Sequence, residues 1–436
     1  MERTVDPATT MTFARSHRRP NWLLRQGDAV RSGVDPDWRG ARRGLALGVL
    51  SAALISCSDM PTYVPHNSGP ALARAAHFWE SNAAVYWNAV ARDMVVVNRS
   101  PAPFAIRGYA IVSVAQYNAA VTAEKEKLGR EHPSVHAAIA AASVTALAYL
   151  YPSQGSTLEG LLADYLADPG WPGERRRDIT SGVAIGRAIG EQIVARARTD
   201  NFFAPGTVEV PAGPCLWFSG STPVGALWGQ AKTFLLLSAD QFRPPPPPPC
   251  ESPEFDAAVA EVRQISDTRT PEQDANAKFW DLPVGTYTPP GYWNEEAATL
   301  AVKYRRTERE SAHVFALMNM VSFDAIVSSH AAKYHYWVAR PSMIDPSITL
   351  SIPLPNFPSY PSNHAAVSAG MAHVLGHTFP AERARLEALA DEAALSRVLA
   401  GIHYRFDGEA GLAMGRAIAA WALANHVHGP DPFVLQ

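Results

Sequence analysis

Apolar residues recur every three or four positions through long Ala-rich stretches of the chain, which is the spacing of one face of an α-helix. The pattern begins at about Phe78 and is clearest over residues 106–126, 134–150 and 177–200. No window alternates polar and apolar residues for long enough to indicate a half-buried β-strand. The sequence therefore predicts a mainly α-helical fold.

Proline and glycine interrupt the helical pattern twice. The first interruption lies between about Phe202 and Glu254 and contains six consecutive prolines, Pro244–Pro249. A polyproline segment is stiff and extended, so it indicates a spacer, a rigid surface loop or a ligand for a peptide-recognition domain. The second interruption is Leu282–Asn294. Helices are expected to resume over about residues 295–339, 365–376, 381–399 and 408–424.

Composition limits the class of protein without identifying it. The 436 residues are 47% hydrophobic and 18% charged, which is typical of a globular protein with two or three domains or one large one. Lysine and arginine total 38 against 41 acidic residues, and the net charge of −3 gives no general attraction for nucleic acid. Three cysteines are too few for a disulfide scaffold or a thiolate metal cluster.

An apolar run near the N-terminus has the features of an export signal. Residues Gly44–Ser56 follow Arg42 and Arg43 directly, and the run ends in Leu-Ile-Ser-Cys57. The run is shorter than the roughly 20 apolar residues that cross a membrane, and its basic flank and short apolar core are typical of a secretory signal. Leu-x-Ser-Cys resembles a bacterial lipoprotein box, which implies a lipid on Cys57. The alternative is a core helix with an incidental cysteine.

This interpretation divides the chain into an export signal over residues 1–57, a polar tether over 58–74 and one helical domain over 75–436. It predicts an exported protein of the bacterial cell envelope that contacts the membrane only through its lipid anchor. The signal carries nine arginines and five acidic residues, so its removal changes the net charge from −3 to −7. Cys215 and Cys250 then remain, either as a disulfide or as two buried free thiols.

Three short segments in the last third of the chain concentrate residues that bind oxyanions. In the first, Lys333 and Arg340 are followed by Pro341. Seven residues of helix turn through about 700°, within about 20° of two full turns, so both cations are expected on one helical face. Pro341 would then help to end the helix. Taken alone, such a pair is more often a solvated stripe.

The second segment runs from Phe357 to His364 and precedes a helical stretch. Ser362 and Asn363 stand where a helix N-cap is expected, and a helix N-terminus offers free N–H groups and a positive dipole end to an anion. His364 would lie within proton-transfer distance of that anion. An ordinary capped helix with an incidental histidine is the alternative for this segment alone.

The third segment contains Ser396, Arg397, His403 and Asp407. If His403 and Asp407 share a helical turn, their spacing lets the carboxylate set the tautomer of the imidazole and leave its other nitrogen free. Asp407 could equally be a capping residue at the start of a helix.

Together the three segments supply three cations, a helix N-terminus and two histidines, an inventory for phosphoryl or oxyanion chemistry. Their order resembles the three-part signature of the type-2 phosphatidic acid phosphatase and vanadium haloperoxidase superfamily. The surrounding FPSYPSNHA and SRVLAGIHYRFD sequences resemble its soluble, chloroperoxidase-like bacterial branch. The resemblance covers about residues 75–430 and implies a large helical-bundle domain of the haloperoxidase and acid phosphatase type. The matching residues are Lys333, Arg340, Pro341, Pro361, Ser362, His364, Ser396, Arg397, His403 and Asp407.

The resemblance implies a role for each anion-binding residue. Lys333, Arg340 and Arg397 would neutralise the equatorial oxygens of vanadate or phosphate, and the Ser362 hydroxyl and the Asn363 N–H would donate to them. The family usually has glycine where this chain has Asn363. The backbone N–H remains available, whereas the side chain adds bulk beside the anion and reaches the backbone angles of glycine less easily.

The resemblance also implies the reacting groups. His403 would bond to vanadium in a haloperoxidase or attack phosphorus in a phosphatase, and Asp407 would orient it. His364 would be the acid/base, and Phe357 would line the halide side of the pocket.

The implied function is that of a vanadium-dependent haloperoxidase-like enzyme, which oxidises halide with hydrogen peroxide at a His-bound vanadate and halogenates an organic acceptor. The alternative is an acid phosphatase of the same superfamily, which hydrolyses phosphomonoesters through a phosphohistidine and needs no cofactor. A non-catalytic, anion-binding surface lipoprotein is a third interpretation. One geometry can serve both reactions because vanadate mimics the five-coordinate transition state of phosphoryl transfer.

Overall fold

The structure is a computed structural model that describes residues 82–126, 132–167, 174–426 and 431–433. Within these residues the regular elements are helices. Two isolated β-bridges occur but no β-strand, so the predicted mainly α fold is confirmed. The predicted export signal, the lipidated Cys57 and the tether lie outside the described residues.

The α-helices differ widely in length, and the longest has 29 residues. Three short 3₁₀-helices, Pro152–Gln154, Trp228–Gln230 and Pro380–Glu382, lie between them in the described part of the chain. The α-helices are α2 (Ala83–Val97), α3 (Ala102–Glu126), α4 (Val135–Leu150), α5 (Gly155–Ala167), α6 (Arg176–Ala197), α7 (Pro253–Thr268), α8 (Pro271–Phe279), α9 (Thr288–Lys303), α10 (Glu308–Tyr336), α11 (Pro341–Ile344), α12 (Asn363–Thr378), α13 (Arg383–Leu399) and α14 (Arg405–Asn425).

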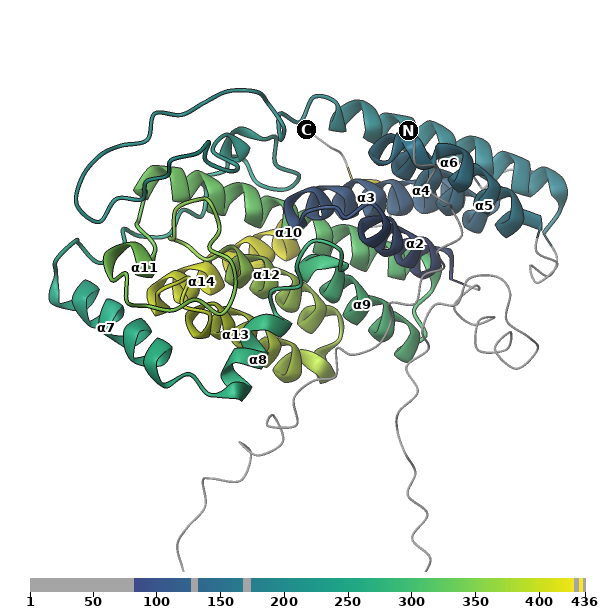
Figure 1. The fold of residues 1–436 in the computed structure, drawn as a ribbon. Coiled ribbons are helices and arrows are strands. Elements are labelled where there is room, and N and C mark those ends of the chain that lie inside the picture. The colour runs from purple at the N-terminus through teal and green to yellow at the C-terminus, as the bar shows by residue number, and fades with distance from the viewer. Residues whose placement is uncertain (1–81, 127–131, 168–173, 427–430, 434–436) are drawn as a thin grey trace, which may run out of the picture. The chain divides into compact units, whose positions relative to one another are not determined.

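The long helix α10 is the centre of the domain, with α3 packed on one side of it and α12 on another (Figure 1). Helices α2, α4 and α6 pack against α3, and α5 packs against α4, whereas α13 and α14 pack against α12. Among the described helices α10 is the one long and apolar enough to cross a membrane. However, 94% of its apolar window is buried inside the protein, as expected for a core helix.

Helices α12 and α14 approach each other closely because glycines face the contact. A Cβ atom on Gly415 would lie 2.1 Å from the carbonyl oxygen of Ala366, and one on Gly411 would lie 2.6 Å from that of Ser362. The backbone N–H of Ser362 also donates to the carbonyl of Asp407 at 2.9 Å. The close approach therefore brings the start of α14 to the start of α12, where the candidate site lies.

We expect Gly415→Ala to lower the free energy of unfolding by about 3 kcal/mol, because a backbone carbonyl cannot move aside as a flexible side chain can. Gly160→Ala is the matched control, since a Cβ there has nothing within 4 Å. The control should be neutral or slightly stabilising because alanine favours an exposed helix. Urea denaturation of both variants measures the difference, and equal stabilities would show that the helices are less closely packed than described.

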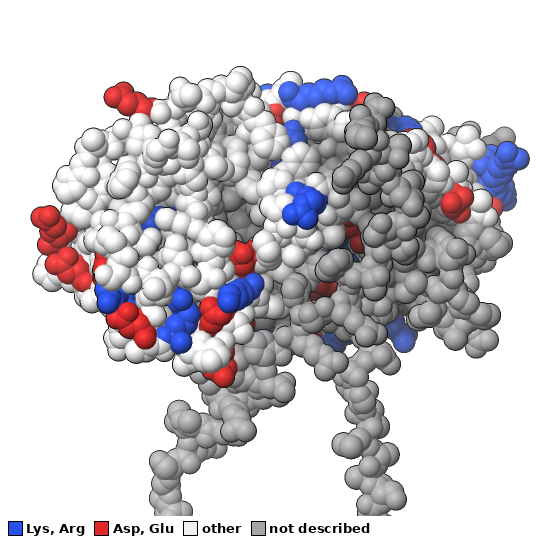
Figure 2. All heavy atoms as spheres, in the orientation of Figure 1, with Lys and Arg blue, Asp and Glu red and all other residues white. Residues whose placement is uncertain are grey.

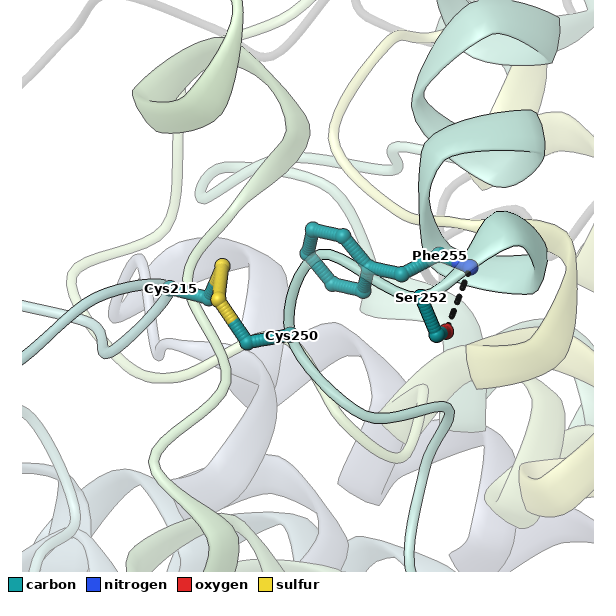
Figure 3. Close-up of a disulfide and its surroundings, with 4 residues drawn as sticks. All are labelled: Cys215, Cys250, Ser252 and Phe255. Carbon is teal, nitrogen blue, oxygen red and sulfur yellow. Dashed lines mark hydrogen bonds between the residues drawn. A yellow bond between two sulfur atoms is a disulfide. The ribbon is translucent and has the colours of Figure 1, made fainter.

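The stretch between α6 and α7 contains one 3₁₀-helix and is otherwise irregular. A disulfide joins Cys215 to Cys250 with an S–S distance of 2.02 Å (Figure 3). Just beyond it, the hydroxyl of Ser252 accepts from the N–H of Phe255 at 3.2 Å and caps α7 (Figure 3). The cysteines therefore attach the end of the Pro-rich stretch to its beginning.

Two tyrosines hold the polyproline run on the domain. The hydroxyl of Tyr336 donates to the carbonyl of Pro244 at 2.8 Å, and that of Tyr360 donates to Pro245 at 2.6 Å. Proline has no N–H, but its carbonyl remains an acceptor. Of the three roles that the proline run indicates, the structure matches the rigid surface loop.

Two sequence predictions about helix boundaries are wrong. The segment Leu282–Asn294 is not wholly irregular, because α9 begins at Thr288. Pro289 and Pro290 are its first residues after Thr288, where a missing N–H costs no helical hydrogen bond. The helix expected over 295–339 is two helices, because Thr307 forms a capping box that starts α10 anew.

Candidate active site

The three predicted segments meet around a set of buried cations. Lys333 and Arg340 are 0% exposed and Arg397 is 1% exposed. On the face drawn in Figure 2, basic and acidic side chains are interspersed, so the buried cations are not the extension of a basic patch there. Buried cations cost free energy unless an anion or hydrogen-bond acceptors compensate them.

Lys333 and Arg340 do not share a helical face, which corrects the sequence prediction. Helix α10 ends because Trp337 adopts a left-handed conformation, with φ of 54°. The residues after it pair with the Cys215 segment, and the N–H of Ala339 donates to the Cys215 carbonyl at 2.9 Å. Arg340 is the N-cap of α11, and Pro341 begins that helix instead of ending α10. A turn and an extended pairing therefore bring the two cations together.

Lys333 organises the loop that precedes α12. Its Nζ donates to three carbonyl oxygens, those of Pro358 at 2.9 Å, Ser359 at 2.7 Å and Pro361 at 2.6 Å. Burial and the charge of Arg340 hold the pKa of Lys333 well below its usual value. Lys333 thus shapes the loop and adds positive charge, while its ammonium hydrogens are directed at carbonyl groups.

Arg340 has a free donor at the centre of the site. Its Nε donates to the carbonyl of Phe357 at 3.0 Å, and its Nη1 donates to that of Ile402 at 2.7 Å and to His403 Nε2 at 3.0 Å. Its Nη2 is buried and has no hydrogen-bond partner among the described residues. Burial lowers the pKa of Arg340 to about 10. A bound oxyanion would satisfy this donor and restore the pKa.

Arg397 reaches the site from the end of α13. Its Nη2 donates to the carbonyl of Ala277 at 2.7 Å and its Nε to the Ser396 hydroxyl at 3.0 Å. The remaining Nη1 lies 3.6 Å from Asp281 Oδ1, and burial lowers the pKa of Arg397 to about 10. Burial raises the pKa of Asp281, and the Arg397 charge opposes that rise. The C-terminal end of α8 and the residues after it therefore hold Arg397 in place. Asp281 is a neighbour of the site that the sequence did not predict.

His403 and Asp407 are in contact, although they do not share a helical turn. His403 lies before α14, and Asp407 is the third residue of that helix. Nδ1 of His403 lies 2.8 Å from Asp407 Oδ2, and its Nε2 faces the donor Nη1 of Arg340. The hydrogen is therefore on Nδ1, and the lone pair of Nε2 points into the site. Burial and the nearby charges of Arg340 and Lys333 hold the pKa of His403 well below its usual value.

Ser359 is a second partner of Asp407, and no motif in the sequence indicates it. Its hydroxyl donates to Asp407 Oδ2 at 2.5 Å, and the N–H of Tyr404 donates to the same oxygen at 3.1 Å. Burial raises the pKa of Asp407 to about 6, and the Ser359 hydrogen bond opposes that rise. Asp407 is therefore both the capping residue and the orienting carboxylate, two roles that the sequence left open.

We expect Ser359→Ala to move the acidic limb of the pH profile of kcat/KM upward by roughly one pH unit. The lost hydrogen bond favours the ionised carboxylate, so its removal raises the pKa of Asp407 further. Asp407 then becomes protonated at a higher pH and stops accepting from His403. Ser368→Ala removes another buried hydroxyl, which pairs with Trp293, and should leave the limb in place. Superimposable profiles for wild type and Ser359→Ala would contradict this role.

The start of α12 presents backbone donors to the site. Ser362 is the N-cap, and its hydroxyl accepts from the N–H of Ala365 at 3.5 Å, so the hydroxyl hydrogen is available to an anion. The N–H groups of Asn363 and His364 have no carbonyl acceptor within the helix, as at any helix N-terminus. The predicted combination of N-cap hydroxyl, backbone donors and helix dipole is therefore assembled here.

His364 is held in one tautomer. Its Nε2 lies 3.1 Å from the carbonyl of Trp280, which can only accept, so the hydrogen is on Nε2 and the lone pair is on Nδ1. Burial and the charge of Arg397 hold the pKa of His364 well below its usual value. The ring is therefore neutral, and Nδ1 is the atom that can accept a proton.

Phe357 forms an apolar wall beside the cations. Its ring centroid lies 5.1 Å from Lys333 Nζ and 5.0 Å from the guanidinium carbon of Arg340. Both cations are thus within cation–π distance of one aromatic ring. The position agrees with a ring that lines one side of an anion pocket.

The described residues fit a bound tetrahedral or trigonal-bipyramidal oxyanion. Three buried cations face one buried carboxylate, Asp407, and the donor Nη2 of Arg340 has no protein partner in the described part of the chain. An anion would neutralise the excess positive charge and satisfy that donor. No group of three or more His, Cys, Asp or Glu side chains that could hold a metal ion occurs among the described residues. The arrangement of donors and cations therefore fits an oxyanion, and Nε2 of His403 faces the Arg340 guanidinium.

Comparison with known proteins agrees with this geometry. Residues 313–428 match the family model described as the PAP2 superfamily, and this range contains all three motifs. The match covers the C-terminal part of the chain and is to the superfamily predicted from the motifs. No curated protein matches the sequence.

Solved structures with a similar fold are bacterial vanadium haloperoxidases. The first bacterial vanadium-dependent iodoperoxidase has a TM-score of 0.69 and 23% identity, over 81% of this chain and 97% of that chain. A holo-type bacterial vanadium-dependent chloroperoxidase has a TM-score of 0.59 and 14% identity, over 73% and 91% of the two chains. The apo-type chloroperoxidase gives the same TM-score and identity, over 77% and 95%. The family match and the shared fold support an enzyme, either a haloperoxidase or a phosphatase.

Proposed function

We propose that the protein is a vanadium-dependent haloperoxidase-like enzyme that oxidises halide with hydrogen peroxide. The observation that carries the proposal is the burial of the anion-binding residues: Arg340 and Ser362 are 0% exposed, Arg397 is 1% exposed and His403 is 3% exposed. Such a site suits a small inorganic oxyanion and small co-substrates better than an ester with an organic group. The fold shared with bacterial vanadium-dependent iodo- and chloroperoxidases supports the same choice.

The described residues account for how vanadate would be held. His403 Nε2 would be the vanadium ligand, since Asp407 holds the hydrogen on Nδ1, and it would give up its present hydrogen bond from Arg340 Nη1 to take that place. Arg340 Nη2, the Ser362 hydroxyl and the start of α12 would donate to the oxygens. When bound, vanadate would supply the Lewis acidity that activates hydrogen peroxide toward halide.

His364 would handle the peroxide proton at Nδ1. Because the Trp280 carbonyl retains the hydrogen on Nε2, a proton that arrives at Nδ1 produces an imidazolium ion close to Arg397. That charge repulsion favours rapid return of the proton, as a general acid/base requires. Phe357 would exclude water from the side where halide enters.

Phosphomonoester hydrolysis is the second candidate, because the state of His403 suits both reactions equally. The neutral ring would attack phosphorus through Nε2 once that nitrogen gives up its hydrogen bond from Arg340 Nη1. A phosphatase of this kind would need no vanadate.

The experiment that tests the proposal compares the two reactions on one preparation. The protein is depleted of vanadate with a chelator, and half is then loaded with orthovanadate. Iodide, bromide and chloride oxidation with hydrogen peroxide are assayed for both halves, beside hydrolysis of an aryl phosphate. We expect halide oxidation in the loaded half alone. Robust phosphatase turnover in the depleted half, with no halide oxidation after loading, would overturn the proposal in favour of the phosphatase.

We also propose that the protein is lipid-anchored in the cell envelope through Cys57, on the strength of the sequence pattern alone. Cys57→Ser should move the protein from the detergent phase to the aqueous phase in membrane partitioning, because the serine hydroxyl is not a lipoprotein modification site. Cys215→Ser is the matched control and should leave the partitioning unchanged. Equal partitioning of Cys57→Ser and wild type would contradict the anchor.

A further inference from the structure

Asn363 stands at the first position of α12, where the family resemblance places glycine, and its side chain is fully engaged. Its Oδ1 lies 2.7 Å from the hydroxyl of Ser329, and its Nδ2 lies 3.1 Å from Nε2 of His330. Both partners belong to α10, one turn before Lys333. The amide therefore connects the central helix of the domain to the anion-binding end of α12.

The direction of every hydrogen bond in this group follows from one carbonyl. Nδ1 of His330 lies 3.0 Å from the carbonyl of Gly225, which can only accept, so Nδ1 carries the hydrogen. Nε2 of the neutral ring is then an acceptor, and it must face the Nδ2 donor of Asn363. The amide orientation places Oδ1 toward Ser329, whose single hydroxyl hydrogen has two acceptors in reach, Asn363 Oδ1 at 2.7 Å and the carbonyl of Ile326 at 3.1 Å, and the shorter distance favours Oδ1. One arrangement satisfies all four groups.

The ring of His330 cannot move or gain a proton easily. The residue is 0% exposed, its ring centroid lies 4.5 Å from that of Trp228 and 5.3 Å from that of Phe357. Burial and the charges of Lys333 and Arg340 lower the pKa of His330 to about 3. The ring thus remains neutral at the pH of any ordinary assay, and its Nε2 remains an acceptor for Asn363.

We infer that His330, Asn363 and Ser329 form a positioning relay that holds the Asn363 side chain on α10 and so keeps it out of the space where the Asn363 backbone N–H meets a bound oxyanion. Asn363 has an ordinary helical backbone as the first residue of α12, so glycine at this position would differ chiefly by having no side chain to hold. With asparagine, the side-chain hydrogen bonds fix χ1 and keep the amide against α10 instead of beside the anion. The inference rests on the proposed function in that it assumes a bound vanadate or phosphate.

The test is a double-mutant cycle read by vanadate affinity, measured by isothermal titration calorimetry on the purified full chain. We expect His330→Leu to weaken vanadate binding about tenfold, since the lost hydrogen bond frees the Asn363 amide to move into the site. His330→Gln keeps an acceptor in reach of Asn363 Nδ2 and should restore much of the affinity. His313→Leu, about 25 Å away along the same helix, is the control and should bind as wild type does.

The second arm of the cycle repeats His330→Leu in an Asn363→Gly background. If His330 acts through the asparagine, the histidine substitution should have no further effect there, because glycine has no side chain that could enter the anion site. A purely structural role of His330 in the core would weaken binding equally in both backgrounds, and that result would overturn the relay. If His330→Leu does not fold, Ser329→Ala, which removes the other hydrogen bond of the amide, replaces it in both backgrounds, and an affinity equal to that of wild type in the Asn363 background would also overturn the relay.

The outcome separates the relay from the proposed function, because the readout is affinity and not turnover. A protein that binds vanadate but does not oxidise halide overturns the proposed function, while a tenfold weaker His330→Leu variant still supports the relay. A wild type that oxidises halide, with vanadate affinity unchanged in His330→Leu, overturns the relay and leaves the function in place. A wild type that binds neither vanadate nor phosphate overturns both.

Discussion

Replacing His403 with alanine is expected to lower turnover by about a thousandfold or more, whether the reaction is halide oxidation or phosphomonoester hydrolysis. The reason is the tautomer of the ring. Asp407 accepts a hydrogen bond from Nδ1, so Nε2 keeps its lone pair, which faces the Arg340 guanidinium. Alanine offers no lone pair to vanadium or phosphorus. Steady-state turnover and vanadate affinity are measured together, and both should fall.

The matched control for this prediction is His373→Ala. His373 lies on α12, as His364 does, but its charged neighbours are Glu387 and Arg383 and not the anion-site cations. The control should keep the turnover and the melting temperature of wild type. If His403→Ala turned over as fast as the control, the reaction would have to occur elsewhere in the protein. If the melting temperature of His403→Ala equals that of wild type, its loss of turnover is a loss of chemistry and not of fold.

The site residues were predictable from sequence, whereas the reason given for two of them was wrong. Lys333 and Arg340 were expected together because seven helical residues make nearly two turns. The chain leaves the helix between them, at Trp337, which has no glycine-like signal for a left-handed conformation. Instead, the seven residues make a turn at Trp337 and a short extended stretch that pairs with the Cys215 segment. The motif therefore identified a tertiary arrangement that helical periodicity could not explain.

Helices α7 and α8 were not predicted because their apolar pattern is weak, although the residues at their N-termini are typical of helix starts. Ser252 precedes Pro253 and an acidic first turn, which is typical of a helix N-terminus. Thr270 begins a capping box that closes on Gln273. Attention to caps as well as to apolar spacing would have predicted both helices. The capping box at Thr307 would likewise have shown that α9 and α10 are separate.

Three contributors to the site could not have been found by spacing. Asp281 meets Arg397, and His330 meets Asn363, only after distant helices have packed. Ser359 lies inside the second motif, but its partner Asp407 belongs to the third. Each is an ordinary polar residue until the fold buries it, and burial is what forces such groups to find partners. Sequence motifs identified residues that the fold brings together around the buried cations, whereas the residues that support them emerge from packing.

Arg340→Lys is expected to weaken the binding of vanadate or phosphate about a hundredfold, although the positive charge is kept. The guanidinium makes three contacts in one plane, to the carbonyls of Phe357 and Ile402 and to His403, and still has Nη2 free for the anion. An ammonium group is a single point with three hydrogens, so it cannot reach all of these positions. Lysine would therefore satisfy the carbonyls or the anion, but not both.

Two measurements distinguish loss of the anion donor from general damage to the site. Without anion, Arg340→Lys should lower the melting temperature because one of the two carbonyls loses its donor. The stabilisation that saturating vanadate adds should shrink as well, since it depends on affinity. Arg405→Lys, at an exposed pair with Glu261, is the control and should change neither quantity appreciably. If Arg340→Lys lowered the melting temperature but bound vanadate as wild type does, Nη2 would be a structural group, and the anion would have to be held by Arg397 and the start of α12 alone.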